Sequence, residues 1–141
     1  MQDQFSRTRL LLGSDAVDRL LHCRVAVFGL GGVGGAAVEA LARAGVGALD
    51  LIDNDTVALS NLNRQTVATH ETLGRYKTDA AMERVLSINP NCKVTVHRTF
   101  YMPENAENFD FRDYDYIIDA IDTVSAKLSL IEQADAAGVP I

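Results

Sequence analysis

The segment 24-RVAVFGLGGVGGAAVEALARAGVGALDLID-53 decides the fold of this 141-residue chain. Its first five residues are mostly apolar and end at Gly29, which is typical of a strand buried on both faces. The alanine-rich run from Gly32 to Ala44 predicts a helix, and the glycines that follow it mark the end of that helix. Leu49 to Asp53 is a second apolar run and predicts a second strand. The segment is therefore a strand, a helix and a strand, the unit from which parallel sheets are built.

The rest of the sequence continues this alternation. Further helices are expected over Ser14 to Leu21, Lys77 to Ser87 and Val124 to Ala137, and further strands over Lys93 to His97 and Tyr116 to Ala120. Thr56 to Leu73 is polar and weakly periodic, which predicts a long loop with one helical turn, and such loops usually have a function. The pattern predicts an α/β fold, a Rossmann-like, doubly wound and mainly parallel sheet that binds its ligand at the carboxyl ends of the strands.

Length and composition exclude several classes of protein. The hydrophobic fraction of 48% suffices for the core of one domain, and the net charge of −6 excludes a sequence-wide attraction to nucleic acid or anionic lipid. No run approaches the roughly 20 apolar residues of a membrane span. The first nine residues are polar and do not resemble a signal peptide, so a cytoplasmic protein is expected. Cys23 and Cys92 lack paired spacing and are expected to be reduced thiols, and the histidines lack metal-ligand spacing.

The glycine turn predicts a nucleotide site. Gly29, Gly31 and Gly34 form a G-x-G-x-x-G pattern between strand and helix, and Gly32 thins the loop further. These glycines permit a tight turn, close approach of the backbone to a phosphate, and close helix packing. The helix N-terminus adds unpaired N–H groups that favour an anion. Asp53, at the end of the second strand, is placed to accept hydrogen bonds from ribose hydroxyls. The alternative is a glycine turn that serves packing alone.

Residues further along the chain indicate which nucleotide is bound. A hydride transfer with NAD needs orientation of two rings, whereas cleavage of ATP after its α-phosphate needs cations at the phosphates and carboxylates for magnesium. Such groups follow the predicted strands, where the sheet topology would bring them beside the glycine turn: Asn61, Arg64, Gln65, Lys77 and Asp122. Asp55 is either a further nucleotide or metal contact or a turn residue. The sequence therefore predicts binding of ATP and Mg²⁺.

The same motifs resemble a known superfamily over nearly the whole chain. The glycine turn, Asp53-Asn54-Asp55, Ser60 to Gln65, Gly74 to Lys77 and Asp119-Ala120-Ile121-Asp122 resemble the HesA, MoeB and ThiF superfamily, which is related to ubiquitin-activating enzymes. Within it, three stretches look most like the tRNA threonylcarbamoyladenosine dehydratases: Phe5 to Thr8, Val38 to Gly47 and Ser87 to Pro90. The resemblance implies that residues 1–141 are an ATP-binding adenylation domain. By their apolar pattern, Val139 to Ile141 look like the first residues of a fifth strand, so we expect the chain to be the N-terminal part of a longer one, lacking its C-terminal strands.

Roles for individual residues follow from this resemblance. It implies that Asp53 holds the ribose, that Asn61, Arg64 and Lys77 meet the phosphates, and that Asp122 binds magnesium. Arg7 corresponds to an arginine that reaches into the site of a partner subunit, which implies a homodimer with shared active sites. Arg64, Lys77, Asp122 and Arg7 are thus the expected catalytic residues. For Asp122 the competing interpretation is an N-cap of the helix that starts near Val124.

The reaction implied by the resemblance is adenylation of a carboxylate, most simply that of the dehydratase subgroup, and three other hypotheses remain open. In the dehydratase subgroup the carboxylate is that of threonylcarbamoyladenosine in tRNA, and ring closure by the neighbouring carbamoyl group then releases AMP. The second hypothesis is adenylation of the C-terminal glycine of a ubiquitin-like sulfur carrier, with a carrier or cysteine desulfurase as partner. The third is an NAD-binding oxidoreductase or a nucleotide-binding module without chemistry. A fourth is a fragment that binds ATP without turning it over.

Overall fold

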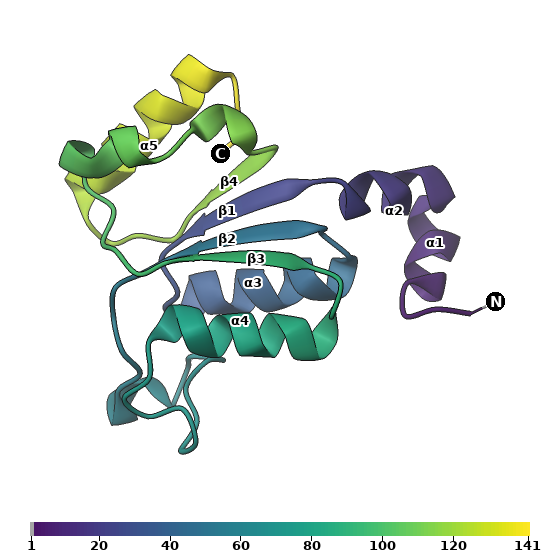
Figure 1. Ribbon diagram of the computed structural model, residues 1–141, viewed down its shortest axis with the longest axis horizontal. Helices are drawn as coiled ribbons and strands as arrows, with labels where there is room; N and C mark the ends of the chain where they lie inside the picture. The colour runs from purple at the N-terminus through teal and green to yellow at the C-terminus, as the bar shows by residue number, and fades with distance from the viewer. Residues whose placement is uncertain (1) are drawn as a thin grey trace.

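A four-stranded parallel sheet forms the centre of the protein in the computed structural model, which describes residues 2–141, so Met1 of the expected 1–141 domain lies outside it (Figure 1). The strands lie in the order β3, β2, β1, β4. Their bounds are Arg24–Phe28 for β1, Ala48–Ile52 for β2, Lys93–His97 for β3 and Tyr116–Asp119 for β4. The predicted doubly wound, Rossmann-like sheet is confirmed, because the strand order reverses between β1 and β4.

Helices cover both faces of the sheet. α3 (Gly32–Ala44) and α4 (Lys77–Ile88) lie on one face, and α5 (Val124–Ala137) lies on the other with the short 3₁₀ helices η2 (Pro103–Asn108) and η3 (Phe111–Asp113) (Figure 1). The apolar core is divided accordingly into two clusters. Val27 and Leu51 pack towards α3 and α4, whereas Phe28 packs among aromatic rings on the α5 side. Alternating strand residues fill the two clusters, as a sheet buried on both faces requires.

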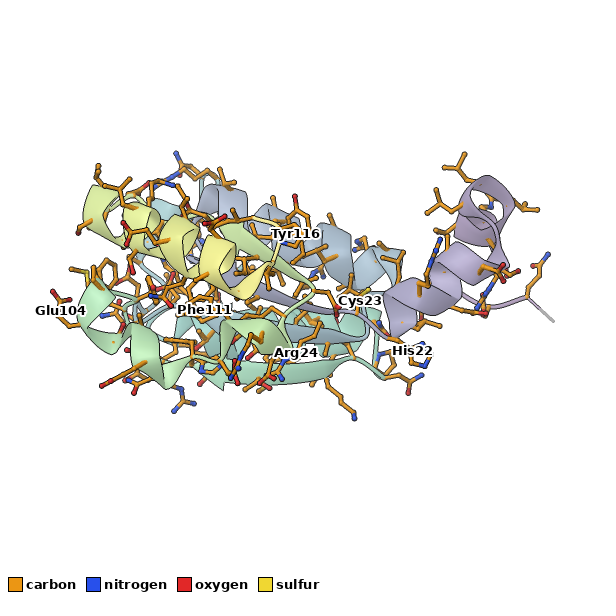
Figure 2. The ribbon with its side chains drawn as sticks, turned by 90° about the horizontal axis from the view of Figure 1, so that it is seen from above. His22, Cys23, Arg24, Glu104, Phe111 and Tyr116 are labelled. Atoms are coloured by element: carbon orange, nitrogen blue, oxygen red, sulfur yellow. The ribbon has the colours of Figure 1, made fainter. Side chains whose placement is uncertain are left out.

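The main departure from the sequence pattern is a helix near the N-terminus. α1 (Ser6–Leu12) and α2 (Ser14–Leu21) form a pair beyond the amino ends of the strands, and α1 was not predicted. Figure 2 shows this pair standing apart from the body, with His22 and Cys23 where the chain enters the sheet. α1 buries no residue of its own, so its helical pattern is weak. The ring of Phe5 packs against Gly45, and Arg9 joins the two helices through Asp18 at 3.0 Å.

The other differences are small. β2 begins and ends one residue earlier than predicted, β4 ends one residue earlier and α4 ends one residue later. The predicted helical turn in the long loop is η1 (Leu59–Asn61). A fifth strand over Val139 to Ile141 is not formed among residues 2–141, although the N–H of Ile117 donates to the carbonyl of Pro140 at 2.9 Å. Cys23 and Cys92 are free thiols, and no helix in the described chain is long and apolar enough to cross a membrane.

A buried carboxylate interrupts the apolar sequence of β2. Asp50 is only 1% exposed and accepts hydrogen bonds from Arg24 Nε and Nη2 at 2.8 and 3.0 Å. Its Oδ2 also lies 2.8 Å from His97 Nε2 and accepts the hydroxyl of Tyr114 at 3.3 Å. Burial by itself raises the pKa of Asp50, but the hydrogen bonds from His97 and Arg24 outweigh it and hold this pKa below its ordinary value. The charged carboxylate therefore links β1, β2, β3 and the loop before β4.

Asp50→Asn is expected to lower the free energy of unfolding at pH 7 by about 3 kcal/mol, because it leaves the Arg24 guanidinium without its charged partner. A carboxyl group whose pKa is lowered by folding stabilises the protein above its unfolded pKa, and this contribution is lost as pH falls. The difference in free energy of unfolding between the wild type and the variant should thus become smaller below about pH 4. Urea denaturation at several pH values measures it. Asp135→Asn, at an exposed position of α5, is the control, and equal effects of the two substitutions would contradict this assignment.

Candidate active site

A cavity of about 340 Å³ lies at the carboxyl ends of the strands, beside the glycine turn. The lining combines backbone of the turn with polar and charged side chains from five segments that are distant in the sequence. The predicted site residues that line it are Gly29, Gly31, Asp53, Asp55, Asn61, Arg64, Gln65, Lys77 and Asp122. The structure therefore brings together the guanidinium, the ammonium and the carboxylate that the sequence analysis singled out. Three predicted residues, Gly32, Gly34 and Arg7, do not line this cavity.

The glycines of the turn divide into packing and lining positions. Gly29 has a φ of +96°, and a Cβ on it would lie 2.5 Å from the carbonyl oxygen of Ala120. A Cβ on Gly34 would lie 1.7 Å from the carbonyl oxygen of Gly29, so this position tolerates no side chain. Gly31 differs, because the nearest atom to its Cβ would be Nε2 of Gln65 at 3.8 Å. Its missing side chain leaves room in the cavity beside the N-terminus of α3, where N–H groups lack helical acceptors.

Asp53 holds the turn in place. Its Oδ2 accepts the N–H of Leu30 at 2.8 Å, and its Oδ1 accepts the N–H of Asp55 at 2.7 Å. Each carboxylate oxygen keeps a further lone pair, so the side chain can still accept hydroxyl groups of a ligand. The sequence pattern predicted only the contact with ribose hydroxyls. The backbone carbonyl of Asp55 in turn accepts the N–H of Lys77 at 3.0 Å, which fixes the start of α4 at the cavity.

The two cations of the cavity lie in different surroundings. Lys77 is 6% exposed, and its Nζ lies 3.8 Å from Oδ2 of Asp55. Asp55 thus faces Lys77 rather than serving the turn alone. Arg64 is exposed and donates to the carbonyl of Ser60 at 3.1 Å and to Oδ1 of Asn63 at 2.8 Å. It has no carboxylate partner within residues 2–141, which leaves its charge available to an anion.

Two amide side chains accompany Arg64 in the loop after β2. Asn61 is buried and lines the cavity, and its Oδ1 accepts the N–H of Ala58 at 2.9 Å. Gln65 is 7% exposed, and within the described chain its Oε1 is a buried oxygen without a hydrogen-bond partner. A buried acceptor without a partner costs stability, so a ligand that donates to Gln65 would relieve that cost.

Asp122 supplies a carboxylate to the cavity from the segment between β4 and α5. It is exposed and precedes Thr123, the N-cap residue of α5, and no side chain caps this helix. The interpretation of Asp122 as an N-cap is therefore wrong. Residues 2–141 contain no cluster of three metal-ligating side chains, so the cavity offers a divalent cation few protein ligands. Magnesium suits such a site, because it often takes one or two carboxylates and completes its shell with phosphate oxygens and water.

Arg7 lies far from this cavity in its own chain. It is an exposed residue of α1, beyond the amino ends of the strands, whereas the cavity lies at their carboxyl ends (Figure 1). Any contribution of Arg7 to a site would therefore have to be made to another copy of the chain.

Several lining residues escaped the sequence analysis. Thr99, Phe100 and Tyr101 form a wall of the cavity after β3. The others lie at the end of β2 or after β4: Ile52, Ala120, Ile121 and Thr123. The hydroxyl of Tyr101 lies 2.8 Å from Oγ of Ser129, and burial raises the pKa of this tyrosine, so it remains a neutral phenol. Most of these residues are apolar, and apart from Ala120 and Ile121, which lie inside the Asp119 to Asp122 motif, they carry no motif. The available signal was their position directly after strands, where ligands bind in such sheets.

Residues 5–141 match the model of the ThiF family. The chain belongs to the ThiF family. Its fold is that of solved members: the E. coli tRNA N6-threonylcarbamoyladenosine dehydratase, TcdA, crystallised in complex with ATP, superposes with a TM-score of 0.94 at 41% identity, over 97% of this chain and 56% of that one. The resemblance stated from the sequence is thus confirmed at the level of the family.

ThiF-family relatives with related names extend the comparison. The chain is 45% identical over 130 residues to the tRNA threonylcarbamoyladenosine dehydratase of Haemophilus influenzae, covering 92% of this chain and 50% of that protein. It is 37% identical over 129 residues to the probable adenylyltransferase/sulfurtransferase MoeZ of Mycobacterium tuberculosis, covering 92% and 33%. The chain therefore spans about half the length of the dehydratases it matches.

Two glycine variants should separate packing from lining. Gly34→Ala should lower the free energy of unfolding by more than about 3 kcal/mol, since its methyl group would overlap the Gly29 carbonyl. Gly31→Ala should change it by less than about 1 kcal/mol, because φ at this position is −73° and no atom lies within 3.8 Å. Thermal and urea denaturation measure both. A Gly31→Ala protein as unstable as Gly34→Ala would disprove the distinction.

Proposed function

We propose that this protein binds ATP in the cavity beside the glycine turn and transfers AMP to a substrate carboxylate. The observation that carries the proposal is the meeting of Arg64, Lys77 and Asp122 in that one cavity. Two cations and a carboxylate suit a triphosphate and its metal ion better than a dinucleotide, which needs no such set for hydride transfer. The ATP complex of the E. coli relative supports the same ligand.

The chain's own residues act on the phosphates in this proposal. The carboxylate attacks the α-phosphorus of ATP, a bond forms from carboxylate oxygen to phosphorus, and pyrophosphate leaves with the electrons of the broken bond. Negative charge grows on the bridging and terminal oxygens during this step. Lys77 is buried, so it can stabilise that charge more strongly than it could in water, and Arg64 lacks a carboxylate partner in the described chain, so its charge is available to the phosphates. Asn61 and Gln65 position the nucleotide by donating and accepting hydrogen bonds.

Asp122 is the residue we assign to Mg²⁺. Its exposed carboxylate at the cavity fits a cation that takes its other ligands from phosphate and water. When bound, the ion would supply neutralisation of the charge on the leaving pyrophosphate. Asp53 is assigned to the ribose hydroxyls through the lone pairs that its two backbone hydrogen bonds leave free.

The proposed acceptor is the threonyl carboxylate of threonylcarbamoyladenosine in tRNA. The dehydratase name of the Haemophilus relative supports this choice, as does its 45% identity over most of the chain. The adenylated carboxylate would then be attacked by the neighbouring carbamoyl group, closing a ring and releasing AMP, with net loss of water. In this proposal residues 1–141 are the adenylation domain, and tRNA as substrate places the protein in the cytoplasm.

A sulfur-carrier protein is the second candidate acceptor. The 37% identity to MoeZ favours it, although that relative is less similar to this chain than the dehydratase. Such an acceptor would present the carboxylate of its C-terminal glycine to the same phosphorus, and a cysteine desulfurase could then be a partner. The chemistry of the cavity is the same for both acceptors, so an experiment must separate them.

ATP–pyrophosphate exchange with the full-length protein tests the function and the acceptor together. We expect exchange to depend on tRNA that carries threonylcarbamoyladenosine, and to be absent with candidate carrier proteins alone. Arg64→Ala and Lys77→Ala should each lower the exchange rate by about 100-fold, because each removes a cation from the developing charge. Arg75→Ala is the matched control, since Arg75 lies in the same loop but pairs with Glu83 at 2.7 Å outside the cavity.

The possible outcomes are distinct. Exchange stimulated only by a carrier would eliminate tRNA as the acceptor and leave adenylation intact. Calorimetric binding of NAD in preference to ATP with magnesium, unaffected by Arg64→Ala and Lys77→Ala, would eliminate adenylation as well.

We also propose a homodimer in which Arg7 of one copy completes the site of the other. The distance of Arg7 from its own cavity supports this arrangement. Arg7→Ala and Lys77→Ala proteins, each inactive alone, should regain about a quarter of wild-type exchange when unfolded and refolded together, because half the dimers then hold one intact site of two. Exchange activity of the mixture is the measurement. No recovery, with mixed dimers shown by mass spectrometry, would refute a shared site.

A further inference from the structure

Other parts of the protein hold the cavity wall that consists of Thr99, Phe100 and Tyr101. At its far end Tyr101 is 1% exposed and its hydroxyl lies 2.8 Å from Ser129 of α5. In its middle the carbonyl of Phe100 accepts the amide of Asn105 at 2.9 Å. At its near end the chain leaves β3 through Arg98, in a turn where the N–H of Thr99 donates to the carbonyl of His97 at 2.9 Å. The position of the near end therefore depends on what Arg98 contacts.

Arg98 contacts the first turn of α4 on both sides of Lys77. Its Nε and Nη2 donate to the two carboxylate oxygens of Asp79 at 3.1 and 2.6 Å. Its guanidinium carbon lies 4.9 Å from the centre of the Tyr76 ring, and Tyr76 is the N-cap residue of α4. The hydrogen bonds to Asp79 raise the pKa of Arg98. A planar guanidinium that forms two parallel hydrogen bonds and stacks on a ring is held in one orientation, which lysine cannot reproduce.

Lys77 and the wall line the same cavity, so the contacts of Arg98 connect two of its sides. Arg98 itself does not line the cavity. We infer that Arg98 is a positioning residue: its clamp on Tyr76 and Asp79 sets the Thr99–Tyr101 wall at the correct distance from Lys77 for a nucleotide that contacts both. The inference rests on the proposed nucleotide site and adds to it a residue that touches neither nucleotide nor acceptor.

The stability of the fold depends little on this clamp. Arg98 is 53% exposed, and exposed ion pairs contribute little to the free energy of unfolding. A nucleotide that contacts both the Thr99–Tyr101 wall and Lys77, by contrast, loses contacts with one of them when Arg98 no longer holds Tyr76 and Asp79. Lys77 and Arg64 remain in place and still act on bound ATP. The clamp should therefore affect the affinity for ATP far more than the rate at saturating ATP.

Arg98→Ala in the full-length protein should raise the KM for ATP in pyrophosphate exchange by roughly tenfold and change kcat by less than about twofold. The dissociation constant of ATP by isothermal titration calorimetry should rise by the same factor. The KM of Arg98→Lys for ATP should lie between those of the wild type and Arg98→Ala. Asp79→Ala should raise the KM similarly, and the double variant should raise it no further than either single one, because both remove the same contact.

Arg112→Ala is the matched control. Arg112 makes an equivalent exposed pair with Asp110, through Nε and Nη2 at 3.1 and 3.2 Å, and neither residue lines the cavity. It should leave the KM for ATP unchanged. Wild-type protein that fails to bind ATP would refute the proposed function itself. Wild-type protein that binds ATP, with Arg98→Ala indistinguishable from Arg112→Ala or with a fall in kcat at unchanged KM, would overturn this inference alone.

Discussion

The site depends on one carboxylate that accepts two backbone N–H groups. Asp53 accepts the N–H of Leu30, in the glycine turn, at 2.8 Å and the N–H of Asp55, in the following loop, at 2.7 Å. Hydrogen bonds to an ionised acceptor are strong, and these two join the chain after β1 to the chain after β2. The carbonyl of Asp55 then accepts the N–H of Lys77, so the start of α4 is held by the same series of bonds. The residue that we propose binds a ribose is thus also the residue that shapes the cavity.

The loop that carries most of the polar groups is closed at its base. Thr56 and Tyr76 form an antiparallel bridge, and Val57 exchanges hydrogen bonds with Gly74 and Arg75. This closure returns the chain to the cavity directly before Lys77. A long loop would otherwise be free to vary in conformation, so the bridge adds to the Asp55–Lys77 hydrogen bond in holding the two ends of the loop together.

Local charge matters more than net charge for the proposed ligand. The chain carries a net charge of −6, yet many of its arginines face carboxylates, as Arg24 faces Asp50 and Arg84 faces Glu39. Arg64 has no such partner within residues 2–141, and the nearest carboxylate to Lys77 Nζ lies 3.8 Å away. An acidic protein can therefore attract a triphosphate at one point, because charges beyond about 10 Å are largely screened in salt solution.

Sequence alone determined the elements whose signals are local. The glycine turn, the bounds of β1 and α3, and the polar groups placed after strands follow from backbone constraints and apolar periodicity within a few residues. Tertiary structure alone decided the contacts between distant residues, such as the Asp50 cluster, whose partners Arg24 and His97 lie 26 and 47 residues away. It also decided that Gly34 serves packing and Gly31 lines the cavity, and that Arg98 reaches Asp79. No local pattern encodes these pairs, because each depends on which side chains the packed sheet and helices bring within hydrogen-bond reach.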